Sequence, residues 1–131
     1  IERQDQFNGE IIVADRQRIE QVLTNLLSNA IKYSPGEEKV IVHSSTNGAE
    51  LVIKVTDFGI GIPQEEQANI FERFYRTRDT SIHISGFGLG LYIAKDIISR
   101  HNGKIWVESQ EKGSAFYFSL PLMIRQAAPD V

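Results

Sequence analysis

The chain has 131 residues, of which 41% are hydrophobic and 24% charged, with a formal net charge of −3. These values fit one soluble globular domain with a substantial core, and the charge gives no argument for nucleic acid or an anionic membrane. The lack of cysteine excludes disulfides and thiolate metal sites and permits a reducing compartment. There is no 18-residue apolar run and no signal peptide. The start at Ile1, without Met, suggests a piece of a longer protein.

The first part of the chain is predicted to contain two short extended segments and a long helix. Residues 1–9 are polar and are interpreted as an approach segment or the remnant of an edge strand, and residues 10–14 as a short strand. Residues 18–35 are predicted to be an amphipathic helix with Asp15 as its N-cap. Pro35 ends the helix, because a proline disfavours helix in the residue before it. Its apolar arc consists of Ile19, Val22, Leu23, Leu26, Leu27, Ala30 and Ile31.

The second part is predicted to begin with a β-hairpin. Residues 39–46 and 50–56 are strands joined at Asn47-Gly48, a strong hairpin signal because both residues tolerate positive φ. The remaining elements are a short helix within 64–78, a polar mobile loop at 78–85, a helix at 88–101 ended by Asn102-Gly103, strands at 104–109 and 115–120, and a frayed tail at 123–131.

The order of these elements defines the fold class. It lacks the strict alternation of strand and helix that a doubly wound parallel sheet requires. It predicts an α/β sandwich (α+β), with a mixed, mostly antiparallel sheet of about five strands and helices packed on one face. Residues 1–122 are expected to form one domain, and residues 123–131 a disordered tail.

The polar side of the first long helix is the first candidate for chemistry. Asn25 and Asn29 lie four residues apart with Lys32 following, and Asn is a poor helix former in interior positions. Two amide oxygens and an ammonium in a row suit a hydrated Mg²⁺ and the phosphates that it carries. From this helix alone, a solvated face on a core helix explains the pattern equally well.

The second candidate is Asp57-Phe58-Gly59-Ile60-Gly61-Ile62-Pro63, directly after the third strand. The two glycines let the backbone turn sharply and let a flat ligand approach. A carboxylate at a strand end can accept a hydrogen bond from an exocyclic amine such as N6 of adenine, with Ile60 and Ile62 as apolar walls. Taken alone, a glycine turn whose Asp caps its own backbone is a somewhat better explanation.

Two further motifs lie on either side of the polar loop. Gly86-Phe87-Gly88-Leu89-Gly90-Leu91 opens the second long helix, where glycines expose N–H groups to an anion. It is neither a Walker A loop nor a convincing Rossmann motif, and a flexible hinge is the alternative. In Phe71-Glu72-Arg73-Phe74-Tyr75-Arg76, the two arginines can reach a terminal phosphate. A core helix with a charged outer face explains the same residues, and for Phe71 it is preferred.

The order of these motifs resembles the catalytic and ATP-binding domain of sensor histidine kinases, within the Bergerat-fold ATPases. Over about residues 15–122, the match consists of an N box at 25–33, a G1 box at 57–61, an F box at 71–76 and a G2 box at 86–91. The family usually begins with a longer first strand than this chain offers, so the sheet is expected to be short by one edge.

The resemblance implies a site for ATP and Mg²⁺. For the metal and phosphates the implied residues are Asn25, Asn29, Lys32 and Arg76, with Asn29 as the Mg²⁺ ligand and Arg76 at the γ-phosphate. For the base they are Tyr33, Asp57, Gly59, Gly61, Ile62 and Ser114, with Asp57 on the adenine amine. For an ATP lid over about residues 73–90 they are Gly86, Gly88, Leu89 and Gly90.

The implied function is transfer of the γ-phosphate to a histidine on a separate dimerisation and phosphoacceptor domain of the same protein, and through it to a response regulator. The acceptor motif is absent from this chain, so His43 and His101 are expected to be structural and His83 exposed. The isolated domain is expected to be a monomer without nucleic-acid or membrane contacts. It would be the cytoplasmic part of a membrane-anchored sensor kinase.

Two alternatives remain at this point. An ATPase switch of the gyrase or heat-shock chaperone kind, or an anti-sigma serine kinase, would carry a Glu general base four residues before the metal-binding Asn. This chain has Asn25 there, which argues against efficient hydrolysis. A scaffold that binds no nucleotide is the other alternative, and the intact Asn29, Lys32 and Asp57 argue against it.

Overall fold

The computed structural model describes residues 2–6, 14–32, 36, 39–72, 90–109 and 112–122, with the backbone alone for residues 2–6 and Lys32. In chain order the elements are β1 (Glu2–Gln6), α1 (Arg16–Lys32), β2 (Val40–Thr46), β3 (Glu50–Asp57), α2 (Gln64–Gln67), α3 (Gly90–Arg100), β4 (Lys104–Ser109) and β5 (Ser114–Pro121).

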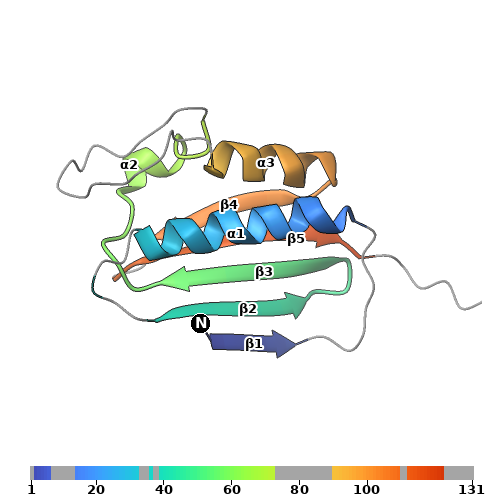
Figure 1. The fold of residues 1–131 in the computed structure, drawn as a ribbon, viewed down its shortest axis with the longest axis horizontal. Helices are drawn as coiled ribbons and strands as arrows, with labels where there is room; N and C mark the ends of the chain where they lie inside the picture. The colour runs from blue at the N-terminus through green and yellow to red at the C-terminus, as the bar shows by residue number, and fades with distance from the viewer. Residues whose placement is uncertain are drawn as a thin grey trace, which may run out of the picture.

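The five strands form one sheet in the order β1-β2-β3-β5-β4 (Figure 1). β1 pairs with β2 in parallel, and the other three neighbouring pairs are antiparallel. The predicted mixed, mostly antiparallel sheet of about five strands is therefore confirmed. This order makes β3 and β5 direct neighbours, although α2, α3 and β4 lie between them in the chain.

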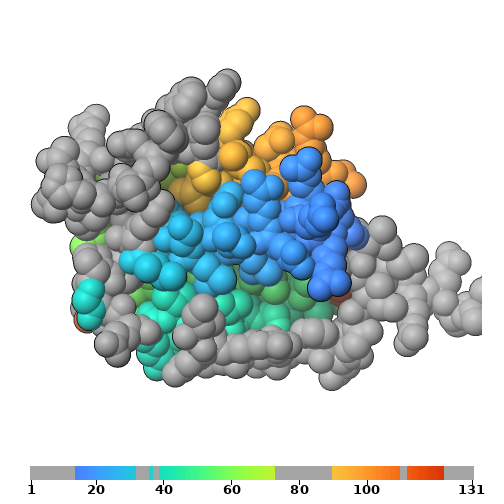
Figure 2. All heavy atoms as spheres, viewed as in Figure 1, coloured from blue at the N-terminus to red at the C-terminus, as the bar shows by residue number. Residues whose placement is uncertain are grey.

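The helices α1 and α3 cover one face of this sheet (Figures 1 and 2). Their apolar residues recur with the helical period and meet the inward-facing residues of the strands. The fourteen buried residues of this core are Val22, Leu26, Ala30, Val40, Val55, Ile62, Ile70, Phe71, Ala94, Ile97, Ile98, Phe116, Phe118 and Leu120. Burying this surface stabilises the fold and holds the ends of α1, α3, β3 and β5 in place.

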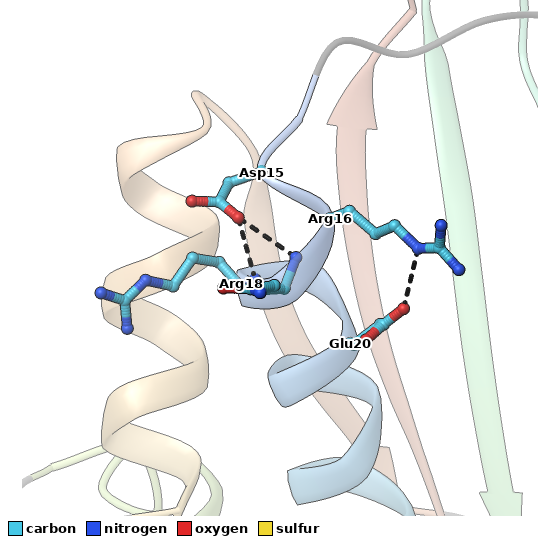
Figure 3. Close-up of polar contacts among 5 residues, drawn as sticks. Asp15, Arg16, Arg18 and Glu20 are labelled. Carbon is cyan, nitrogen blue, oxygen red and sulfur yellow. Dashed lines mark hydrogen bonds and ion pairs between the residues drawn. The ribbon is translucent and has the colours of Figure 1, made fainter.

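The start of α1 confirms the predicted N-cap (Figure 3). The Asp15 Oδ1 atom accepts hydrogen bonds from the backbone N–H groups of Gln17 at 3.1 Å and Arg18 at 3.3 Å. These are two of the donors that a helix start leaves unpaired. The helix begins at Arg16, two residues earlier than the apolar pattern indicated. Its predicted end at Pro35 lies outside the described residues.

Ile31 departs from the predicted apolar arc of α1, because its side chain is 61% exposed. It follows the fully buried Ala30 and is therefore rotated by about 100° around the helix. That rotation moves it from the buried face to the margin of the arc. Ile60, a predicted apolar wall, is also largely exposed.

β2 begins one residue later than predicted and β5 extends one residue further at each end, and two larger differences concern β1 and Asp57. Residues 2–6, interpreted from sequence as at most a remnant, form the edge strand β1 because they pair with β2. Asp57 is the last residue of β3 and does not follow it. The hairpin between β2 and β3 lies where Asn47-Gly48 predicted it, although only Gly48, with a φ of +90°, has a positive φ.

Several expectations fall on undescribed parts of the chain. Residues 10–13 of a predicted strand, the loop at 78–85 and the tail at 123–131 lie outside the described residues. Of the predicted helix within 64–78, the structure describes α2, four residues long. In the described ranges, none of the helices has the length and apolar character needed to cross a membrane.

Candidate functional site

Asp57 is a fully buried carboxylate at the end of the central strand β3. Its Oδ1 atom accepts hydrogen bonds from the backbone N–H groups of Gly59 at 3.1 Å and Ser114 at 3.2 Å. Its Oδ2 atom accepts one from the Ser114 hydroxyl at 2.9 Å. Three donors therefore hold the carboxylate in one orientation, and its four lone-pair positions still leave room for one further donor.

The pairing of β3 with β5 brings these residues together, because Asp57 lies opposite Ser114 in the register. Gly113, just before β5, has a φ of +88°, and a Cβ atom there would collide with the backbone oxygen of Asp57. Gly61 has a φ of +74°, and its Cβ would lie 3.1 Å from the Gly113 oxygen. Two backbones thus approach closely at this corner, which L residues with side chains would prevent.

Gly113 is a residue of this corner to which the sequence analysis assigned no role. Its signal was its place in Gly113-Ser114, just before the alternating pattern of the last strand. A glycine there can mark a close backbone approach, but the partner was not evident from sequence. The structure identifies that partner as Asp57.

Ile62 and Phe71 belong to the core beneath this corner. Ile62 is buried in the core cluster, and its backbone oxygen accepts a hydrogen bond from Gln67 Nε2 at 3.0 Å. The ring of Phe71 packs edge-on against Phe116, with centroids 6.5 Å apart. The preference for Phe71 as a core residue is confirmed.

The polar side of α1 presents two amides in different situations. Asn25 Nδ2 donates to the backbone oxygen of Gly90, the first residue of α3, at 3.0 Å. Asn29 Nδ2 is buried and has no hydrogen-bond partner among the described residues. A buried donor without an acceptor is costly, so this amide suits a site that a polar ligand completes.

The two parts of the candidate site lie at the same end of the molecule. The last turn of α1, the end of β3 and the starts of β5 and α3 all lie at the left in Figure 1. Of the predicted site residues, the structure brings Asp57, Gly59 and Ser114 together, with Gly61 beside them, and it joins Asn25 to Gly90. The predicted residues outside the described ranges are Tyr33, Arg76, Gly86, Gly88 and Leu89, and the side chain of Lys32 is also not described.

His101 has the structural role expected of it. Its Nε2 atom accepts a hydrogen bond from the backbone N–H of Asp15 at 3.0 Å, and its Nδ1 atom lies 2.8 Å from the backbone oxygen of Ile97. The second contact requires a proton on Nδ1 and leaves Nε2 as the acceptor. Both ring nitrogens are thus engaged. His43 lies within β2, and His83 lies outside the described residues.

Residues 14–124 match the family model described as "Histidine kinase-, DNA gyrase B-, and HSP90-like ATPase". Because this match covers most of the chain, the chain belongs to that family of ATPases. Its relatives place it among the ATPase domains of the histidine kinase type.

The curated relatives are sensor kinases. The adaptive-response sensory kinase SasA of Prochlorococcus marinus is 44% identical over 115 residues, which cover 85% of this chain and 30% of the relative. The sensor histidine kinase WalK of Bacillus subtilis is 44% identical over 111 residues, which cover 82% of this chain and 18% of the relative. The chain therefore spans less than a third of the curated relatives that it matches here.

Solved structures show the same fold. The nucleotide-free catalytic domain of histidine kinase ThkA matches with a TM-score of 0.79 and 36% identity, covering 91% of this chain and 77% of that one. Full-length ShkA in complex with AMPPNP matches with a TM-score of 0.78 and 28% identity, covering 92% of this chain and 25% of that one.

Proposed function

We propose that the chain binds Mg²⁺-ATP and transfers the γ-phosphate to a histidine on a separate domain of the same protein. The observation that carries this proposal is the fully buried Asp57 carboxylate, held by three donors at a glycine-lined corner with capacity for a fourth. Family membership and the AMPPNP complex of the similar ShkA support ATP as the ligand.

At the base end, Asp57 would accept a hydrogen bond from the exocyclic amine of adenine. Ser114 would hold the carboxylate through its own hydroxyl. Because Ser114 contacts Asp57, it would also lie close to the base. Gly59 and Gly61 would form the floor, because they keep the backbone free of side chains where a flat ring must lie. Tyr33 and the buried Ile62 would provide apolar surface.

At the phosphate end, Asn29 would hold Mg²⁺ and Asn25 would support the phosphates. The unpartnered Nδ2 of Asn29 fits such a ligand, because a phosphate oxygen would satisfy it and rotation of the amide would present Oδ1 to a cation instead. The described residues contain no group of three His, Cys, Asp or Glu that could bind a metal. A magnesium ion here would therefore depend on amide, water and phosphate oxygens, which is its usual environment.

The remaining contacts are proposed on family resemblance. Lys32 and Arg76 would neutralise phosphate charge, and Gly86, Gly88, Leu89 and Gly90 would belong to a lid over the nucleotide. The chemistry supplied by Mg²⁺ is charge neutralisation on the phosphate oxygens, and the protein's part is positioning.

The acceptor histidine would come from a dimerisation and phosphoacceptor domain, which would pass the phosphoryl group to a response regulator. Of the histidines that the structure describes, His101 has both ring nitrogens engaged and His43 lies within the sheet. The nucleotide-binding domain would comprise residues 1–122 and act in the cytoplasm, where ATP is available.

Calorimetry with Mg²⁺-ADP tests the proposal. Asp57→Asn replaces one carboxylate oxygen, an acceptor, with an amide N–H that faces three other donors. The affinity of this variant for Mg²⁺-ADP should therefore fall by at least about tenfold. Asp96→Asn is the matched control, since Asp96 is exposed on α3 and pairs with Arg100. Equal affinities for these two variants, each shown to be folded by circular dichroism, would contradict the proposed base site.

Steady ATP hydrolysis tests the alternative of an ATPase switch. The amide of Asn25 contacts Gly90 and has no basic group to activate water. We therefore expect negligible turnover of ATP by this chain without an acceptor. Sustained release of phosphate under those conditions would favour the switch over the kinase.

A further inference from the structure

Among the described residues, one hydrogen bond links α1 to α3 and another links the residues that flank them. The backbone N–H of Asp15, before α1, donates to Nε2 of His101, after α3, at 3.0 Å. Ten residues further along α1, Asn25 Nδ2 donates to the oxygen of Gly90, at the start of α3, also at 3.0 Å. The helices are therefore antiparallel, with one contact at each end of α3.

The contact at Gly90 depends on a hydrogen-bond donor in the side chain of residue 25. In a regular helix the backbone oxygen of Gly90 accepts from the N–H of Ala94. The same oxygen has a second lone pair, and this one accepts from Asn25 Nδ2. A Cβ atom on Gly90 would lie 4.0 Å from Asn25 Cγ, an ordinary contact, so close packing does not explain the pairing. Apolar packing holds the two helices together, and the amide N–H adds a directional contact at this point.

We infer that Asn25 is a positioning residue, whose amide N–H fixes the first residue of α3 against the polar side of α1. The contact uses the Nδ2 atom, so the Oδ1 atom of the same side chain can accept from or bind a ligand while Nδ2 holds α3. Asn25 would thereby set where the phosphate end of the nucleotide site meets α3, a consequence that rests on the proposed function. A carboxylate at this position would lose the contact, because it has no hydrogen to donate.

Amide hydrogen exchange without nucleotide tests the contact itself. Asn25→Asp keeps the shape and removes the donor, so the backbone amides of residues 94–96, whose helical acceptors are residues 90–92, should exchange about two- to fivefold faster than in the wild type. Asn25→Ala should act in the same direction without adding charge. Gln17→Glu, the same amide-to-carboxylate change at an exposed position of α1, is the control and should leave these amides unchanged. Unchanged exchange in both Asn25 variants, or equal acceleration in the control, would overturn the inference.

The wild-type side chain gives a direct spectroscopic readout. One Nδ2 proton of Asn25 should exchange more slowly than its partner and show a nuclear Overhauser contact to Gly90. Two equally fast protons without that contact would also overturn the inference.

A titration with Mg²⁺-ADP tests the consequence for the site. The resonances of Gly90 and Leu91 should respond in the wild type and respond less at saturation in Asn25→Asp, while those of Asp57 and Ser114 respond in both. An equal response of Gly90 in the two proteins would remove the positioning role. If no wild-type resonance responded, the proposed function would fail, while the exchange data would still decide whether the contact exists.

Discussion

The Ser114 hydroxyl donates to Asp57 Oδ2 across 2.9 Å, and both residues are almost completely buried. Because little water can compete there, this hydrogen bond is stronger than an exposed one, and leaving its acceptor unsatisfied is costly. The contact joins the end of β3 to the start of β5. It makes Ser114 part of the support of the proposed adenine-binding carboxylate.

Replacing Ser114 with Ala removes this donor and leaves the Asp57 carboxylate less restrained. We expect Mg²⁺-ADP affinity to fall about three- to tenfold and the free energy of unfolding to fall by about 1–2 kcal/mol. Calorimetry and urea denaturation measure the two effects. Ser99→Ala, on the exposed side of α3, should change neither by a comparable amount. Indistinguishable results for the two serines would contradict the assigned role of Ser114.

Gly113→Ala should destabilise the protein more than the same change at Gly48. Both glycines have a φ near +90°, so both substitutions strain the backbone by about 1 kcal/mol. Only at Gly113 does the new Cβ collide with another backbone atom, the oxygen of Asp57, whereas nothing lies within 4 Å at Gly48. The collision should add about 1–3 kcal/mol to the loss in unfolding free energy. Equal urea midpoints for the two variants would contradict the prediction and show that the backbone at Asp57 shifts at little cost to accommodate the new Cβ atom.

Asn29→Ala should remove Mg²⁺-dependent phosphoryl transfer. The variant lacks the buried amide that has no partner in the described part of the structure. We expect labelling of a histidine acceptor domain from radioactive ATP to fall by at least about tenfold, in line with the loss of a metal-site contact. Thr24→Ala, an exposed change on the same helix, is the control. Undiminished labelling by Asn29→Ala would defeat the metal assignment.

Tyr117 should lose its proton at unusually high pH. Burial raises the pKa of its phenol, and Glu108, whose Oε2 lies 3.1 Å from the hydroxyl, raises it further through the hydrogen bond and its negative charge. A pKa raised by folding means a contribution to stability that is present below pH about 10 and is lost as the pH passes the folded-state pKa.

Ultraviolet titration of the tyrosinates measures this shift, and Tyr117→Phe identifies its transition by deleting it. Glu108→Gln should lower the pKa of Tyr117 without returning it to the usual value, because burial is the largest cause. A titration unaffected by Glu108→Gln would show that the carboxylate does not act on the phenol.

The helices and most strands were predictable because their signals are local. The apolar period of α1 and the Asp15 cap depend on residues a few positions apart. β1 carries no such signal, since Glu2–Gln6 is entirely polar, and it becomes a strand through parallel pairing with β2. Tertiary pairing decided this segment, which no periodicity could reveal.

The site was predicted as separate residues but not as contacts. The sequence singled out Asp57 and Ser114, yet the bond between them spans 57 positions and exists only because β3 and β5 are neighbours. The same holds for Asn25 and Gly90, which are 65 positions apart. Long-range hydrogen bonds follow from strand order and helix packing, which a single sequence does not display.

The sheet order also determines when this site can form as the chain is made. β3 leaves the ribosome well before β5, and until β5 arrives the only one of its two native neighbours present is β2. A nascent chain that ends before residue 114 therefore has an open strand edge and an Asp57 without its hydroxyl donor. The proposed adenine-binding carboxylate is consequently complete only once residue 114 has been made, so chains that end before β5 should not sequester nucleotide.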